Sequence, residues 1–379
     1  MRRKLERIEI RGEHDARERA RQIVVAAYAA REPTPRRPAR RLAPALAVVA
    51  LGAIAAAALS SPGRALLHSI RETVGVRQAQ SALFSLPAAG QLLVHSDGGL
   101  WVVQADGSKR RLGAYASGSW SPHGLYVAAT RRNTLSALTP TGEERWSLAR
   151  PLVQAPRWAG TKTDTRIAYS SRNGPRVVGG DGRGDIGLGP SLEAGPVTLA
   201  WRPGRRHLLA YALVSQGLIH VVDTDANGKQ LWSATIAGRV SRLGWSSDGR
   251  FLLAFAPRGL RVFDARGKVV ARDDPSDGTR DADATFVPGT HRIAIVRVHG
   301  AQSDVFLLGS GRSLFHVTGR LGRLEASPDG RWLIVAWPDA DQLLFVPVRG
   351  GSLRAVANIS AQFRSQTFPR IEGWCCAQP

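Results

Sequence analysis

The segment from Asp223 to Gly228 contains two aspartates, a threonine and an asparagine before a glycine, which is how a calcium-binding loop begins. The twelfth residue of such a loop supplies a bidentate carboxylate, but here the twelfth residue is Ala234. The segment also lies where a turn between two strands is expected. We therefore predict a plain turn and no metal site.

Two other groups of reactive residues do not form a plausible site. Glu13, His14 and Asp15 are consecutive, so their side chains cannot easily converge on one metal ion, and Asp15 suits the positive end of a helix dipole. Ser310 has a glycine on each side but lacks the nucleophile motif of hydrolases. The nine histidines show no paired ligand spacing. We predict no catalytic, cofactor-binding or metal-binding residue, no cofactor and no enzymatic activity.

The two cysteines, Cys375 and Cys376, are adjacent and almost terminal. They match neither a disulfide framework nor a zinc pattern. A disulfide between them would close a small strained ring, so we interpret them as two thiols without a defined role. The Arg-Gly-Asp triplet that ends at Asp185 lies in a glycine-rich stretch and is given no role either.

The elements that carry these residues follow a repeat. A residue that is aromatic in most copies precedes Ser-Pro-Asp-Gly or a relative of it, and an apolar run follows; the fullest copies begin at Trp120, Trp245 and Ala326. Proline and Asp-Gly favour a tight turn, and the apolar run reads as a strand. We call the first residue of each phrase its anchor. The anchors are Trp120, Trp158, Trp201, Trp245, Phe286 and Ala326, with Trp374 as a last anchor that no strand follows.

The first six anchors are 38 to 44 residues apart, which is the length of one four-stranded propeller blade. Residues 91–104 resemble the later part of a unit that lacks its anchor, and the segment from Arg370 to Trp374 resembles an anchor strand alone. Together these two ends would complete one blade and remove exposed sheet edges. The sequence therefore predicts an all-β propeller over residues 90–379 with about seven blades, six or eight being the alternatives.

At these anchors the chain resembles the WD40-like, TolB-type family of bacterial propeller repeats, over roughly residues 90–379. Two units, Leu138–Trp146 and Val222–Trp232, also resemble quinoprotein-type propeller repeats. The family resemblance implies a propeller and leaves the activity open, because propellers host many functions. The overall layout is similar to that of membrane-anchored bacterial propeller proteins and, in outline, of single-span anti-sigma factors. No anti-sigma zinc motif is present in residues 1–41.

The N-terminal quarter has a different composition. Residues 1–41 form a basic tail with a predicted amphipathic helix over Asp15–Arg31, and residues 42–59 contain no charge. Eighteen apolar residues are enough to cross a bilayer, and the arginines before them favour a cytoplasmic N-terminus. We predict a transmembrane helix over 42–60 and a juxtamembrane linker over 61–89. A cleaved export signal and a buried soluble helix are alternatives.

The net charge of +22 is an ambiguous signal of nucleic-acid binding. The chain has only five lysines, and its arginines are spread along the sequence apart from one cluster before residue 42. This pattern suggests a coding bias as much as a binding surface, so we expect no nucleic-acid partner.

The function predicted from these features is that of a membrane-anchored, extracytoplasmic propeller that binds a protein or ligand at one mouth. One alternative is a signalling protein whose cytoplasmic helix docks a regulator such as a sigma factor, and another is an exported enzyme. Partner-binding loops are expected where the chain departs most from the repeat. The three such segments are Ser171–Pro190, Asp273–Asp283 and Asn358–Pro369.

Overall fold

The computed structural model describes residues 85–161, 163–188, 197–204, 206–213 and 217–376. The predicted helix over Asp15–Arg31 and the predicted span over 42–60 lie outside these ranges. Within the described ranges no helix is long and apolar enough to cross a membrane.

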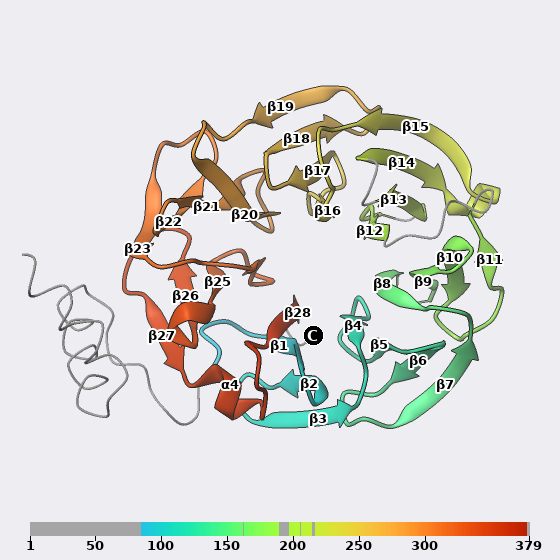
Figure 1. The fold of residues 1–379 in the computed structure, drawn as a ribbon. Coiled ribbons are helices and arrows are strands. Elements are labelled where there is room, and N and C mark those ends of the chain that lie inside the picture. Colours follow the sequence, from blue (N-terminus) through green and yellow to red (C-terminus); the bar gives the residue numbers. More distant parts are fainter. Residues whose placement is uncertain (1–84, 162, 189–196, 205, 214–216, 377–379) are drawn as a thin grey trace, which may run out of the picture. The chain divides into compact units, whose positions relative to one another are not determined.

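Seven four-stranded antiparallel sheets surround a central channel (Figure 1). This arrangement confirms the prediction of an all-β propeller with seven blades. We number the blades along the chain, and the first strand named in each is the innermost. Blade 1 contains β28 (Arg370–Cys375), β1 (Gln91–Ser96), β2 (Gly99–Val103) and β3 (Lys109–Gly113); blade 2 contains β4 (Ser117–Trp120), β5 (Val127–Arg131), β6 (Thr134–Leu138) and β7 (Glu144–Ala149); blade 3 contains β8 (Gln154–Gly160), β9 (Thr165–Ser171), β10 (Gly174–Gly179) and β11 (Ile186–Gly187).

The remaining four blades have the same order from the channel outward. Blade 4 contains β12 (Val197–Trp201), β13 (Leu208–Leu213), β14 (Leu218–Asp223) and β15 (Lys229–Thr235); blade 5 contains β16 (Arg242–Trp245), β17 (Phe251–Ala256), β18 (Gly259–Asp264) and β19 (Val269–Asp273); blade 6 contains β20 (Thr279–Phe286), β21 (Ile293–His299), β22 (Gln302–Leu307) and β23 (Ser313–Thr318); blade 7 contains β24 (Leu324–Ala326), β25 (Trp332–Trp337), β26 (Gln342–Pro347) and β27 (Arg354–Ala357).

The two ends of the propeller close the ring within blade 1, as the repeat predicts. Strand β28 pairs with β1, so that Leu92 lies opposite Trp374. Asp97, in the turn after β1, accepts hydrogen bonds from the backbone of Gln366 (2.7 Å) and from the backbone and hydroxyl of Thr367 (3.0 and 2.7 Å). These bonds hold the segment before β28 against blade 1, and they lower the pKa of Asp97 to about 2.

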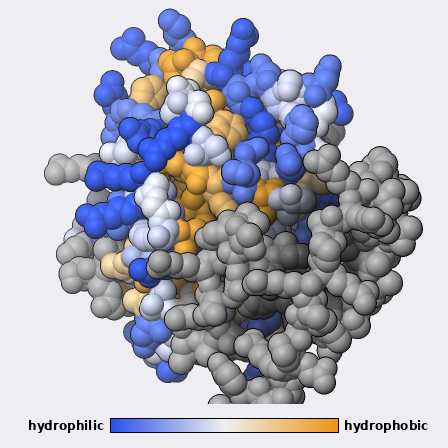
Figure 2. Space-filling view, turned by 90° about the vertical axis from the view of Figure 1, so that its left-hand side faces the viewer, coloured by the Kyte–Doolittle hydropathy of each residue, from blue (hydrophilic) through white to orange (hydrophobic). Residues whose placement is uncertain are grey.

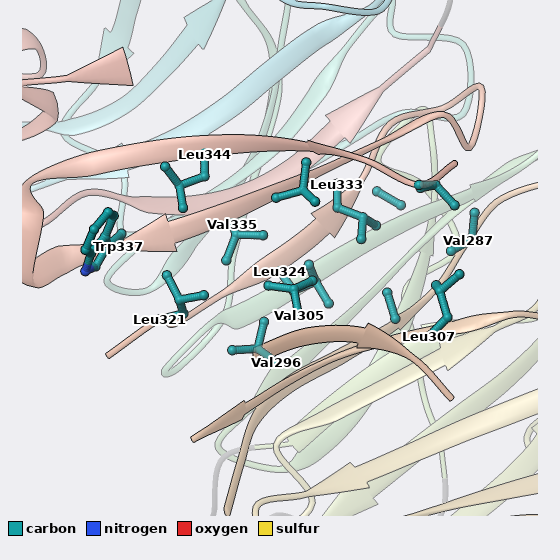
Figure 3. Packing of buried hydrophobic residues seen from close by; sticks show 14 of the residues in the cluster. Val287, Val296, Val305, Leu307, Leu321, Leu324, Leu333, Val335, Trp337 and Leu344 are labelled. Carbon is teal, nitrogen blue, oxygen red and sulfur yellow. The ribbon is translucent and has the colours of Figure 1, made fainter. Parts of the chain in front are cut away.

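The core consists of seven apolar clusters, each formed by two neighbouring blades. Figure 3 shows the cluster between blades 6 and 7, where Val296 and Val305 face Leu324 and Val335. All seven anchors lie on innermost strands. Trp120, for example, packs against Leu93 and Leu100 of blade 1. The anchors therefore join adjacent blades, and the apolar strands behind them fill the space between sheets.

The phrase after Trp120, Trp245 and Ala326 folds as a tight turn, and blade 5 shows why it needs these residues. The buried Ser246 hydroxyl donates to Asp248 Oδ1 (2.7 Å) and accepts from the Phe251 amide (3.0 Å). Gly249 has φ +67°, a conformation that other residues adopt at a cost. Ser327 and Asp329 repeat this hydrogen bond in blade 7, at 2.6 Å.

The segments predicted as irregular loops are more regular than expected. Strands β10 and β11 occupy much of 171–188, and Thr279–Asp283 belongs to β20. The third segment contains the one-turn helix α4 (Ile359–Gln362), and the turns η1 (Thr224–Ala226) and η2 (Pro338–Ala340) lie elsewhere. The propeller region therefore contains one short α-helix besides its strands in the described ranges.

The flank of the propeller is mainly solvent-facing. On the side of β23 and β27, hydrophilic side chains surround a band of hydrophobic ones (Figure 2). Strand β23 has exposed residues interspersed with partly buried ones, among them Leu314, Phe315 and Val317, which pack against the core. The outermost strands thus cover the core and leave the channel as the concave feature of the fold.

Candidate binding site at the central channel

A cavity of about 670 Å³ lies in the channel. The innermost strands of six blades line it, namely β4, β8, β12, β16, β24 and β28. Ser121 and Pro122 of blade 2 and Pro328 of blade 7 also line it, so the cavity reaches the mouth formed by the turns that follow the anchors. Its volume falls within the range of known ligand pockets, roughly 300–1,000 Å³.

On one side of the channel the charges are paired. The Arg242 guanidinium donates to Asp283 Oδ2 (2.9 Å), to the Leu324 carbonyl (2.6 Å) and to Glu325 Oε1. Burial acts against the charge of Arg242, yet the two carboxylates raise its pKa. We call this side, formed by β16, β20 and β24, the matched side.

Two further arginines lie beside the glutamates that line the cavity. Arg323 Nη2 is 3.9 Å from Glu325 Oε1, and its Nε is buried with no acceptor among the described residues. Arg370, by contrast, forms an ion pair with the buried Glu372 through Nη2 (2.6 Å). Both glutamates of the cavity lining are therefore already engaged by arginines, and Arg323 is only weakly paired.

The opposite side is formed by β4, β8 and β12, and we call it the unmatched side. Together these strands carry one charged residue, Arg157. The hydrogen bond from its guanidinium goes to the neighbouring Pro156 carbonyl (2.9 Å), and among the described residues it forms no ion pair. Burial lowers the pKa of Arg157; Glu372 raises it, whereas the charges of Arg323 and Arg242 lower it further.

The backbone around Arg157 is held by the adjacent blades. The Trp158 amide donates to the Ser119 hydroxyl of blade 2 (3.2 Å), and Trp201 Nε1 of blade 4 donates to the Arg157 carbonyl (2.8 Å). Strand β8 is irregular before Arg157, with Ala155 at φ +49°. Bulges of this kind re-aim side chains, here at the channel. Arg157 is thus positioned by three blades.

The two cysteines also line the cavity, and the structure joins Cys375 and Cys376 in a disulfide. Our interpretation of two free thiols is therefore wrong. The sulfur of Cys376 lies 3.3 Å from the Pro122 carbonyl oxygen, against the turn of blade 2. The disulfide consequently forms part of the cavity wall between blades 1 and 2.

The calcium-like segment Asp223–Gly228 and the Arg-Gly-Asp triplet that ends at Asp185 do not offer free carboxylates, because residues of the same chain already bind them. Asp223 to Gly228 forms the turn between β14 and β15, in which Asp223 contacts Arg206 and Asp225 contacts His207 (2.9 Å). Asp185 is buried and accepts from Arg150, Arg176 and Tyr169, at 2.7, 2.8 and 2.7 Å. In the described ranges no group of three or more His, Cys, Asp or Glu residues could hold a metal ion.

The segment 273–283, one of the three expected partner-binding loops, contains five aspartates whose charges are largely neutralised. Arg297 contacts both Asp273 and Asp281, and Arg261 contacts Asp274 at 2.6 Å. Asp283 contacts Arg242 in the channel. Four of the five aspartates in the segment therefore have arginine partners, because the strands place them beside basic residues of neighbouring strands.

The charged channel residues were missed, although the repeat contains a signal for them. Side chains alternate along a strand, so residues one and three positions before an anchor share a face. Arg157 and Glu325 each precede an anchor by one residue, and Arg242, Asp283 and Arg323 precede anchors by three. Aligning the units on their anchors would have shown these charges converging on the channel.

No family model and no curated protein sequence matches the chain. Among solved structures it is similar to the β-propeller domain of Cps50 (Swd1) from Myceliophteria thermophila, with a TM-score of 0.56 and 15% identity over 72% of this chain and 97% of that one. It is also similar to a chain of the mitotic checkpoint complex, with a TM-score of 0.51 and 15% identity over 74% of this chain and 85% of that one. The chain has the fold of a seven-bladed, WD40-like β-propeller.

Proposed function

We propose that the propeller is a protein-interaction module that binds a partner at the channel mouth formed by the anchor turns. The observation that carries this proposal is the cavity of about 670 Å³, to which six blades contribute. A rigid ring with a polar, concave mouth suits the insertion of a side chain or a loop tip. One similar chain belongs to a multiprotein assembly, the mitotic checkpoint complex, which supports a scaffold role.

The proposal treats the chain as a binding protein and not as an enzyme. Site-specific photo-cross-linking tests it in cells that express the full chain. A photo-reactive residue at Pro122 or Pro328, both in the cavity wall, is expected to capture a discrete partner. The matched control is the same residue at Leu231, which is exposed on the outermost strand β15. Capture from Leu231 and not from the two mouth positions would refute the proposal.

We also propose that residues 42–59 anchor the propeller outside the cytoplasm. The uncharged stretch and the arginines before it support this topology. The Cys375–Cys376 disulfide supports it as well, because disulfides persist mainly in oxidising compartments. Protease added to intact cells is expected to degrade the propeller and to spare the first 41 residues. Protection of both parts would place the propeller inside.

A further inference from the structure

We infer that the channel mouth binds a carboxylate group, with Arg157 as its principal counter-charge and Arg323 as a second donor. The inference rests on the proposed function in so far as a protein partner carries the carboxylate, and the second possible source is a free carboxylic acid. Both arginines line the same cavity, and a guanidinium binds a carboxylate through two parallel hydrogen bonds.

The first argument is the cost of a partly buried charge that has no ion pair among the described residues. A guanidinium has five N–H donors, and Arg157 uses one of its nitrogens on a backbone carbonyl beside it. A charge removed from water without a partner destabilises a fold, so buried cations are normally paired. The neighbouring strands β4 and β12 offer no carboxylate to pair with it, and Glu372 of β28, which raises its pKa from a distance, is already paired with Arg370. An anionic ligand would supply the missing partner.

The second argument is the charge balance of the cavity, which favours a single carboxylate. Its lining contains three arginines and two glutamates. Glu325 contacts Arg242, and Glu372 contacts Arg370 from outside the lining. A monoanion would supply a partner for Arg157 and for the weakly paired Arg323, whereas a dianionic phosphate would be repelled more strongly by the two glutamates.

The third argument is fit. A cavity of about 670 Å³ is larger than one acidic side chain and has room for the backbone that bears it. The anchor turns that surround the mouth are held by hydrogen bonds between blades, as where Arg202 donates to the Gly249 carbonyl (2.6 Å). The backbone that carries Arg157 is likewise held by blades 2 and 4 before the ligand arrives, which reduces the entropy lost on binding.

The test titrates the purified full chain by calorimetry with four probes: an end-blocked Gly-Glu-Gly peptide, its Gly-Gln-Gly analogue, propionate and inorganic phosphate. We expect saturable binding of the Glu peptide or propionate, and no binding of the Gln peptide. Arg157→Gln is expected to weaken carboxylate binding by about tenfold or more, as loss of a charge-assisted bidentate contact does. Arg323→Gln is expected to weaken it by about threefold.

The matched control is Arg272→Gln, which removes the same charge from an exposed position on the outermost strand β19. If Arg272→Gln lost as much affinity as Arg157→Gln, the effect would come from net charge alone, and the inference would be overturned. Phosphate binding more tightly than the Glu peptide and propionate would also overturn it. If the Glu peptide binds more tightly than propionate, the natural carboxylate is a side chain of a protein partner. If propionate binds as tightly as the peptide, the natural ligand is a free carboxylic acid. If the mouth cross-links to a partner while carboxylate binding is absent, this inference fails and the proposed function stands.

Discussion

The two sides of the channel differ in how a partly buried arginine is paired. On the matched side Arg242 contacts Asp283 and Glu325, which lie on the next two blades. On the unmatched side Arg157 has only a neighbouring carbonyl, because β4 and β12 present serine, threonine and apolar residues. The comparison suggests that the first arginine stabilises the ring, whereas the second remains available for a ligand.

The largest expected effect on stability is at Arg242, on the matched side. Arg242→Gln leaves two carboxylates near the channel without their cation, and removing one partner of a buried ion pair costs about 3–5 kcal/mol. We expect a large drop in the midpoint of thermal unfolding. Adding Asp283→Asn and Glu325→Gln to the variant is expected to restore much of the loss, because the two carboxylates that paired with Arg242 are then neutral. An unchanged midpoint in the single variant would show that the matched side does not support the ring.

Asp185 gives a second measure of paired charge, away from the channel. Asp185→Asn removes the carboxylate that holds Arg150, Arg176 and Tyr169 around the short strand β11. We expect a loss of about 2 kcal/mol, since hydrogen bonds to charged groups contribute more than neutral ones. Urea unfolding of this variant beside Tyr169→Phe, which removes one neutral donor, measures the difference. Equal losses would mean that the charge of Asp185 contributes nothing.

Asp97 is an exposed carboxylate that contributes to stability where the ring closes. Its pKa is about 2 in the folded chain and about 3.9 in an unfolded one. Because the folded pKa is the lower one, its charge contributes stability above about pH 4, and this contribution is lost as the pH falls towards 2. Asp97→Ala is expected to lower the unfolding midpoint at neutral pH, with a difference from wild type that narrows on acidification. A difference independent of pH would contradict the ionic origin.

The smallest expected effect on stability is at Arg157. Arg157→Gln removes a cation without a carboxylate partner, so stability is expected to remain unchanged or to rise by up to about 1 kcal/mol. The contrast with Arg242→Gln, measured by thermal unfolding under identical conditions, sharpens the distinction between the two sides. A loss as large as that of Arg242→Gln would show that Arg157 is a structural residue.

The propeller fold could be predicted from the sequence because each unit repeats the same short-range contacts between an anchor strand and the turn that follows it. The anchor joins two blades, the buried serine caps the turn, and the glycine adopts positive φ, so the same phrase recurs at Trp120, Trp245 and Ala326. Ring closure followed because the two incomplete ends complement each other. These features depend on neighbouring residues or on one period of the repeat.

The site was harder to predict because it depends on contacts between repeats. Arg242 and Glu325 are two blade periods apart, and neither residue lies in the anchor phrase. The segment 273–283 looked like an acidic loop because its arginine partners lie elsewhere in the sequence, as with Asp281 and Arg297. The disulfide was rejected on ring strain alone. In the first two cases a pairing outside the local pattern decided the outcome, whereas the disulfide joins adjacent residues.

The central claim is that the channel mouth captures its partner through Arg157. The most direct measurement places the photo-reactive residue at Pro122, beside the cavity, in full chains that carry either Arg157 or Arg157→Gln. The account predicts a partner cross-link that falls about tenfold in the Arg157→Gln background and is unaffected by Arg272→Gln. A cross-link of equal yield in all three backgrounds would contradict it.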